Sequence, residues 1–442
     1  MEAKAYGFFS IMCVFLGFAI ITLLFLIVNR KIHSKHKKIV YFLYFFLISA
    51  LISTLFSYSP KNAFLGLQGW YIGFFVIASL VLTIQILKYI NINNNYAFYP
   101  IYITICILFI ITILHSAEID IFNMHEGILY ESYHKYLSTI GNINWYAGYL
   151  SIIAPLFSCL FINSSNRKDT TIYGTISFLS VICVAMLGSD GIYLALLFGS
   201  FFIIPFLVYG KKRMERFSYL IFAYLTGLLL ARYLDYCMDG ISAITRQLKF
   251  IIPCFIFGFS ILLISKCVSN DLLKRKHKTI CITVISVILL SIVALGIYIL
   301  NMPYDDWGTG RLVIWAETII QYCNFTFYNK MFGLGPELLN NIYAPLTNLT
   351  GAVYFSSHSE LFQILVTMGA IGLILWLCCW FCLFADYFKT KSWIDSKMLP
   401  FYISFFCYFG QSLVNSATTL NVCTLSLVMI VYLSLIEESD SK

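Results

Sequence analysis

A first group of side chains that can perform chemistry lies in the run Trp307-Gly308-Thr309-Gly310-Arg311-Leu312-Val313-Ile314-Trp315. Apolar residues recur at intervals of three to four as far as Tyr322, which predicts a helix over 309–322 with Thr309 as its N-cap. Arg311 then lies in the first turn, where a cation opposes the helix dipole. A bound anion reverses that penalty, because free N–H groups, two glycines and a planar guanidinium suit a phosphate or diphosphate. The alternative is a surface arginine stacked on Trp307 or Trp315.

A second group is His358-Ser359-Glu360-Leu361, directly before an apolar segment. A histidine with a carboxylate two residues on suits a general base, which is typically worth about 10²–10⁴ in rate. On local sequence alone, an interfacial histidine without a chemical role is favoured. Asp305-Asp306 suggests a divalent cation, although a solvated pair or a helix-dipole role is favoured.

Three further motifs adjoin apolar segments: Ser59 to Gly66, Ser138 to Asn144, and Gly188-Ser189-Asp190-Gly191. Asp190 is the ionisable residue that lies closest to the interior of an apolar segment. It marks either a helix break with a turn or a functional carboxylate. Gly333-Leu334-Gly335-Pro336 predicts a tight turn.

The elements that must position these motifs are membrane helices. Of 442 residues, 60% are hydrophobic and only 11% are charged, and the mean hydropathy is +0.83. Soluble domains carry about 25% charged residues, so we expect an all-α polytopic membrane protein with about 12–13 transmembrane helices. The predicted spans are 7–29, 39–58, 69–88, 98–115, 144–162, 170–187, 191–209, 217–231, 249–265, 279–300, 361–385, 398–415 and 418–435.

The distribution of charge predicts the orientation. Of the Lys and Arg residues, 21 fall in one set of alternate loops and 8 in the other, while the acidic residues divide 8 to 13. The positive-inside rule makes the first set cytoplasmic, with the N-terminus outside and the C-terminus inside. The net charge of +8 is therefore a topology signal, and nucleic acid is not expected as a partner. Two external loops follow, a large one over 301–360 between the tenth and eleventh spans and a second over 116–143, within a single transmembrane domain, 1–442.

In this order and on one face, the motifs resemble the O-antigen ligase and O-antigen polymerase-like membrane glycosyltransferases. The matching residues are Ser59, Ala63, Phe64 and Gly66; Ser138 to Asn144; Gly310, Arg311 and Trp315; His358, Ser359, Glu360, Gly369 and Gly372; and Tyr408, Gln411, Ser412 and Asn415. The resemblance covers roughly 40–435. It implies a GT-C-like architecture in the bacterial cytoplasmic membrane and transfer of a glycan from a polyprenyl-diphosphate carrier to an acceptor hydroxyl on the outer face.

The resemblance also implies roles for individual residues. His358 would take the proton from the acceptor hydroxyl, and Arg311 would bind the leaving diphosphate. The reaction would invert the anomeric centre without a metal or other cofactor. The implied partners are the lipid-linked glycan donor, the lipid bilayer, and a glycan, lipid or protein acceptor. The residues implied in substrate binding are Asn142, Asn144, Trp315, Glu360, Gln411 and Asn415.

The sequence departs from the family at two positions. Where the family has an arginine that binds diphosphate after a serine, this chain has Asp190, and a second arginine slot is taken by Trp70. The missing cation is expected from Arg232, Arg246 or Lys330, all of which are predicted to be external.

Other functional classes remain open. Ionisable residues are nearly absent from the span interiors, which argues against ion- or proton-coupled transport because such transporters keep them for function. A lipid-linked oligosaccharide flippase or other polysaccharide transporter is the alternative to an enzyme, and a structural subunit of a polysaccharide assembly complex is a third. Ligase and polymerase are not separated by any motif.

Overall fold

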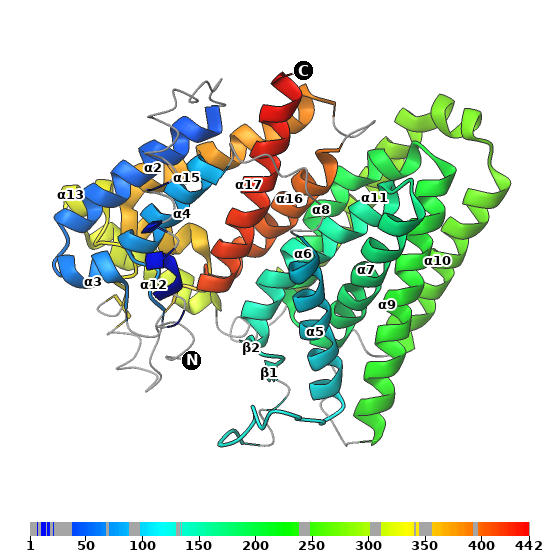
Figure 1. The fold of residues 1–442 in the computed structure, drawn as a ribbon, viewed down its shortest axis with the longest axis horizontal. Coiled ribbons are helices and arrows are strands. Elements are labelled where there is room, and N and C mark those ends of the chain that lie inside the picture. Colours follow the sequence, from blue (N-terminus) through cyan, green and yellow to red (C-terminus); the bar gives the residue numbers. More distant parts are fainter. Residues whose placement is uncertain are drawn as a thin grey trace. The chain divides into compact units, whose positions relative to one another are not determined.

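A computed structural model describes residues 38–67, 70–87, 98–129, 135–237, 248–300, 311–339, 356–391 and 397–441, with isolated positions before residue 22 and at 133 and 342–343. The chain divides into two compact units. Their helices and strands are labelled in Figure 1. Unit 1 comprises Met1–Asn94, Gly296–Phe388 and Ser412–Lys442, and unit 2 comprises Asn95–Leu295 and Lys389–Gln411.

Unit 1 contains helices from three separate stretches of the chain. Their bounds are α2 (Lys38–Leu55), α3 (Pro60–Leu65), α4 (Phe74–Leu87), α12 (Arg311–Asn324), α13 (Phe327–Phe332), α15 (Glu360–Lys389) and α17 (Thr419–Ser441). α4 packs against both α2 and α17. Two of these helices lie inside the stretch 301–360. Helix α12 corresponds to the helix predicted over 309–322, whereas α13 was not predicted.

Unit 2 is built around α6 (Ile143–Asn163), which packs on α7, α8 and α9. The elements before and beside it are α5 (Tyr99–Ser116), the hairpin β1 (Tyr136–Leu137) and β2 (Gly141–Asn142), α7 (Arg167–Leu187), α8 (Asp190–Val208), α9 (Lys211–Cys237), α10 (Leu248–Cys267), most of α11 (Asn270–Leu300) and α16 (Leu399–Ser412). The two strands pair antiparallel. Most of α6 is buried by its neighbours, because small residues and serines such as Ala147, Gly148 and Ser151 allow close packing.

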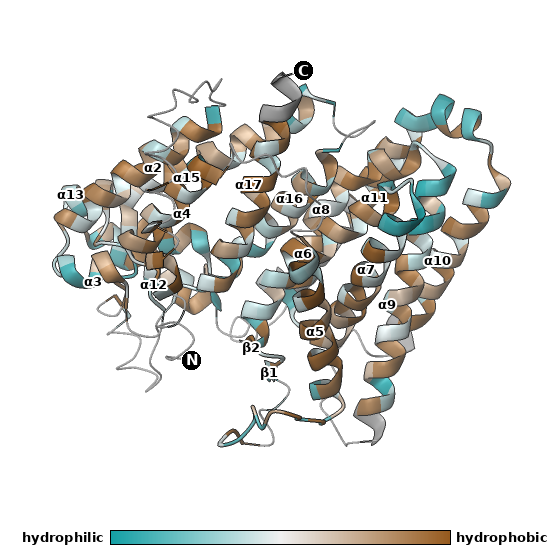
Figure 2. Cartoon of the chain, in the orientation of Figure 1, coloured by the Kyte–Doolittle hydropathy of each residue, from teal (hydrophilic) through white to brown (hydrophobic). Residues whose placement is uncertain are grey.

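Among the described residues, eight helices are long and apolar enough to cross a membrane: α2, α5, α6, α7, α8, α9 up to Leu234, α15, and α17 up to Ile436. The prediction of a helical, multi-pass membrane protein is confirmed at this level. Brown, apolar residues dominate these helices in Figure 2. Each predicted span from 39–58 onward overlaps a helix, although α4 and α16, with 14 residues each, are shorter than the roughly 20 residues that cross a membrane. The predicted span 7–29 lies largely outside the described residues.

Helix α15 is broken at Gly369, where φ is 70° and ψ is −174°. The break leaves backbone carbonyls without their partners in the next turn, which is costly in an apolar setting. Leu334 N–H donates to the carbonyl of Val366 at 3.1 Å, and Gly335 N–H donates to that of Thr367 at 2.9 Å. The hydroxyl of Ser53 also donates to Thr367 O, at 2.8 Å. The segment 333–339, here called the docking segment, therefore hydrogen-bonds to the broken helix and also contains a turn, as predicted.

Glycines permit this docking. A Cβ at Gly369 would collide with the backbone of Met331, and a Cβ at Gly333 would collide with the backbone of Thr367. Both glycines also have positive φ, the region that side chains disfavour. The two segments consequently approach each other backbone to backbone.

Candidate functional site

Arg311 is the first residue of α12. Residues 309–310 of the predicted helix lie outside the described part of the chain. Its buried face carries Ile314 and Thr318, whereas Ile319 of the predicted apolar stripe is 46% exposed. Ile314 packs in one cluster with Leu339 and Val366. This cluster fixes α12 against the 333–339 segment and α15.

Asn415 links Arg311 to the start of α15. The guanidinium Nη2 of Arg311 donates to Asn415 Oδ1 at 3.4 Å. The backbone carbonyl of Asn415 accepts the N–H of Glu360 at 3.2 Å. Asn415 and Glu360 are both buried. Three residues from sequence-distant motifs, Arg311, Glu360 and Asn415, are thus brought together in unit 1.

His358 sits on a turn with a strained backbone. Its φ is +51°, a region uncommon for residues other than glycine. Its N–H donates to Ser356 Oγ at 3.0 Å, and that hydroxyl shares a 2.5 Å hydrogen bond with Ser416 Oγ. Holding a residue in this region costs about 1–3 kcal/mol, and such residues are enriched at functional sites.

Trp315 completes the group. Its indole Nε1–H donates to the carbonyl of Ser357 at 2.9 Å, directly before His358. Its ring lies against Phe362, with centroids 5.6 Å apart. The tryptophan therefore fixes the serine-rich turn 356–359 to α12, one helical turn after Arg311.

The environment holds His358 neutral. Burial lowers the pKa of the imidazole first, and the positive charge of Arg311 lowers it further. Both causes disfavour imidazolium, so the ring is available as a proton acceptor at neutral pH.

In unit 2, the structure brings together Asn142, Asn144 and Gln411. The Oδ1 of Asn142 accepts the N–H of Asn144 at 2.8 Å and so caps α6. Gln411 Nε2 donates to the carbonyl of Asn144 at 3.4 Å, and Ser189 Oγ donates to Asn144 Oδ1 at 3.2 Å. These bonds stabilise the start of α6, and a substrate-binding role for the three amides stays a prediction.

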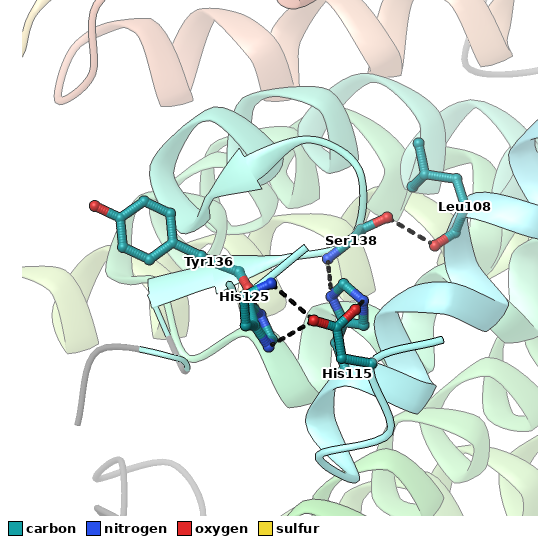
Figure 3. A network of polar contacts seen from close by, with 6 residues as sticks. Leu108, His115, His125, Tyr136 and Ser138 are labelled. Carbon is teal, nitrogen blue, oxygen red and sulfur yellow. Dashed lines mark hydrogen bonds and ion pairs between the residues drawn. The ribbon is translucent and has the colours of Figure 1, made fainter. Parts of the chain in front are cut away.

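A buried network positions the hairpin that carries Asn142 (Figure 3). The backbone N–H of Ser138 donates to His115 Nδ1 at 3.1 Å, and Ser138 Oγ donates to the carbonyl of Leu108 at 3.0 Å. His125 Nε2 bonds the carbonyl of Tyr136 at 2.7 Å. The carboxylate of Asp120 accepts the N–H of His125 at 2.7 Å and lies 3.4 Å from His115 Nε2. The network ties the 120–125 segment and the hairpin to the end of α5.

Three of the four residues considered for the second cation, or as its replacement, lie in the described part of the chain. Asp190 is exposed and opens α8 after the left-handed Gly188 and the N-terminal flanking Ser189. A carboxylate in the first turn of a helix interacts favourably with the helix dipole. This agrees with the interpretation of Asp190 as part of a helix break and turn. Arg232 is exposed near the end of α9, in unit 2. Lys330 lies in α13, and Arg246 lies outside the described residues.

Sequence reasoning missed Glu337, a buried carboxyl in the docking segment. Its Oε2 accepts the N–H of Leu67 at 2.7 Å, and the N–H of Ile72 also donates to the carboxyl. Burial raises its pKa to about 8, although both N–H groups act in the opposite direction. A Cβ on Gly66 would lie 2.5 Å from Glu337 Oε2, so this glycine of the Ser59–Gly66 motif admits the carboxyl.

Glu337→Gln is expected to change how thermal stability depends on pH. The unfolded carboxyl ionises above its usual pKa of 4.5 and the folded one only above about 8. The unfolded state therefore binds fewer protons across this window, and wild-type stability falls as pH rises from 4.5 to 8. The glutamine variant should show a flatter profile in thermal melts of the purified protein in detergent. Parallel profiles for variant and wild type would contradict this pKa.

Comparison with protein-family models gives no match for this chain. Comparison with curated proteins likewise gives no match.

Proposed function

We propose that the protein is a membrane glycosyltransferase of the O-antigen ligase or surface-polysaccharide polymerase type. The observation that carries the proposal is the pairing of a partly buried His358, held in a strained turn, with Arg311 close enough to lower its pKa. A neutral base beside a fixed cation is what transfer from a diphosphate leaving group to a hydroxyl requires. The resemblance of the motifs to that family supplies the substrate class.

In the proposed reaction, His358 accepts the proton of the acceptor hydroxyl as its oxygen attacks the anomeric carbon of the donor sugar. The bond from that carbon to the diphosphate oxygen breaks, and its electron pair leaves with the polyprenyl diphosphate. Arg311 stabilises the negative charge that develops on this leaving group. Attack opposite the leaving group inverts the anomeric centre, and neither a metal nor another cofactor enters the scheme.

The position of the break in α15 supports a site at the membrane surface. From Ala370 to Lys389 the helix has about 20 residues, which is enough to cross about 30 Å of hydrocarbon. The segment 360–368 and the turn with His358 then lie at one boundary of the bilayer, where a polyprenyl diphosphate presents its headgroup. We place this boundary on the outer face of a bacterial cytoplasmic membrane. The positive-inside charge distribution supports the side, and the resemblance of the motifs supports the kind of membrane.

A transporter for lipid-linked oligosaccharide is the competing class. It would place its charged ligand site near the bilayer midplane, whereas the proposed enzyme has Arg311 and His358 before the crossing part of α15. A transporter also leaves the bond between sugar and diphosphate intact. The chemistry of the product therefore separates the two classes.

The test is release of polyprenyl diphosphate from a lipid-linked oligosaccharide by the purified full-length protein, with acceptor and EDTA present. We expect release by wild type, accompanied by elongation or transfer of the glycan to the acceptor. A panel of donors with different sugars guards against a mismatched substrate. Translocation of an intact donor across proteoliposomes, with no release, would replace this proposal by the transporter.

A further inference from the structure

Unit 2 contains a hollow of about 430 Å³ at one end of its helices. It lies where three helical hairpins turn, α6 into α7, α8 into α9, and α10 into α11. Hydrophilic residues gather at this end of the unit in Figure 2. Its volume falls within the roughly 300–1,000 Å³ typical of small-molecule sites.

Four of the residues that line the hollow are cationic: Lys211, Lys212, Arg213 and Lys274. None of the described lining residues carries a carboxylate. The acid on α9 that follows them, Glu215, is already engaged by Lys266 at 2.5 Å and by the hydroxyl of Tyr219 at 2.7 Å. The lining is therefore strongly positive.

Backbone carbonyls and rings hold two of these cations in place. Lys211 Nζ donates to the carbonyl of Lys266 at 3.4 Å. Arg213 donates to the carbonyl of Phe206 at 3.3 Å, and its guanidinium lies 3.9 Å from the centre of the Phe206 ring. Both interactions restrict the conformational freedom of the two side chains. Binding of a ligand therefore costs less side-chain conformational entropy.

The turn between α6 and α7, which contributes Ser164 and Ser165 to the lining, is also fixed. Arg216 is buried and donates to the carbonyls of Phe161 and Ser164 at 2.7 and 2.6 Å, and to Ser164 Oγ at 3.0 Å. It thereby holds the turn between α6 and α7. On the third side, the Oδ1 of Asn270 accepts the N–H of Lys211 at 3.1 Å. The hollow is thus preformed by contacts among all three hairpins.

The positive-inside rule explains why cations lie on this side, but it does not require them to converge. Lys276 and Lys278 on α11 serve that rule equally well, and they are exposed outside the hollow. Like charges around one concavity repel one another, and an anion bound between them would relieve this repulsion. Basic pockets between membrane helices on the cytoplasmic side commonly bind lipid phosphates.

We propose that this hollow is a binding site for a phosphate-bearing anion, with Lys212 and Lys274 as its exposed cationic ligands. Two sources share that chemistry, the headgroup of an anionic phospholipid and a soluble phosphate compound. The site is separate from the Arg311–His358 group in sequence and does not depend on the proposed transferase reaction.

The test uses the full-length protein in nanodiscs of phosphatidylcholine, alone or mixed with phosphatidylglycerol, and reads the melting temperature. In the first arm the lipid composition varies, and in the second inorganic phosphate is titrated into discs of phosphatidylcholine alone. Ionic strength is held constant with sodium chloride, because screening alone changes surface electrostatics. The variant is Lys212→Gln/Lys274→Gln. The matched control, Lys276→Gln/Lys278→Gln, removes the same charge outside the hollow.

Stabilisation of wild type and control by phosphatidylglycerol, lost in the Lys212→Gln/Lys274→Gln variant, would support the proposal and identify lipid as the source. The same pattern with inorganic phosphate would support a soluble source, with half-saturation roughly 10- to 30-fold weaker in the variant. Absence of stabilisation of wild type by either probe would overturn the proposal. An equal response of the variant and wild type would overturn it as well.

Discussion

Replacing His358 with alanine is expected to lower glycan transfer by roughly 10²–10⁴-fold, the usual contribution of a general base. The acceptor hydroxyl would then have to lose its proton to water during attack. Because the imidazole makes no contribution to donor binding in the proposed scheme, the loss should fall on kcat more than on KM. The measurement is single-turnover release of polyprenyl diphosphate from a lipid-linked donor.

A structural role for His358 predicts a different pattern. The left-handed backbone at this residue means that a substitution also alters the local strain, so the thermal melt of each variant is recorded beside its rate. Added imidazole should restore part of the activity of His358→Ala if the ring acts as a base. Full activity in a well-folded His358→Ala protein would remove the residue from the mechanism and turn attention to Asp190.

Replacing Arg311 with alanine is expected to lower transfer by roughly 10²–10³-fold, because a preorganised donor to the leaving group is lost. Arg311→Lys should recover only part of this, since an ammonium cannot offer two parallel hydrogen bonds to a diphosphate. Gln321→Ala is the matched control on the same helix, because Gln321 bonds to Glu317 at 2.7 Å. A loss in Gln321→Ala as large as in Arg311→Ala would show that the effect comes from damage to α12.

The same arginine predicts a shift in pH dependence. Its charge is the second cause that lowers the pKa of His358, after burial. In Arg311→Gln the imidazole should protonate more readily, so the acidic limb of the kcat/KM profile should move to higher pH. An acidic limb that stays in place would mean that a group other than His358 controls it.

The helices were predictable because each is encoded locally. Every span from 39–58 onward is an apolar run of sufficient length or nearly so, and the structure contains a helix at each of them. Helix α12 also follows from its periodicity. Its buried face does not, because Ile314 packs in a cluster with Leu339 and Val366. Thr318 is buried where its hydroxyl hydrogen-bonds to that of Tyr343 at 3.0 Å. Nothing in the 311–324 sequence reveals these partners.

The candidate site was predictable in part. The motifs identified Arg311, His358 and Glu360, and the structure shows that Asn415 links two of them. Glu337 left no signal in the sequence, because its burial depends on backbone groups 270 residues away in the chain. The conformation of His358 was equally hidden, since the two serines that hold it, Ser356 and Ser416, lie outside the motifs and 60 residues apart in the chain.

The break at Gly369 also constrains the biogenesis of the protein. Helix α15 cannot satisfy its own carbonyls at Val366 and Thr367, and the groups that do so come from Ser53, Leu334 and Gly335. All three leave the ribosome before α15, so its partners are already synthesised when it reaches the insertion machinery. The donors for these two carbonyls are therefore present when α15 is inserted. In a circular permutation that places 333–335 after α15, two of the donors would be synthesised only after the broken helix.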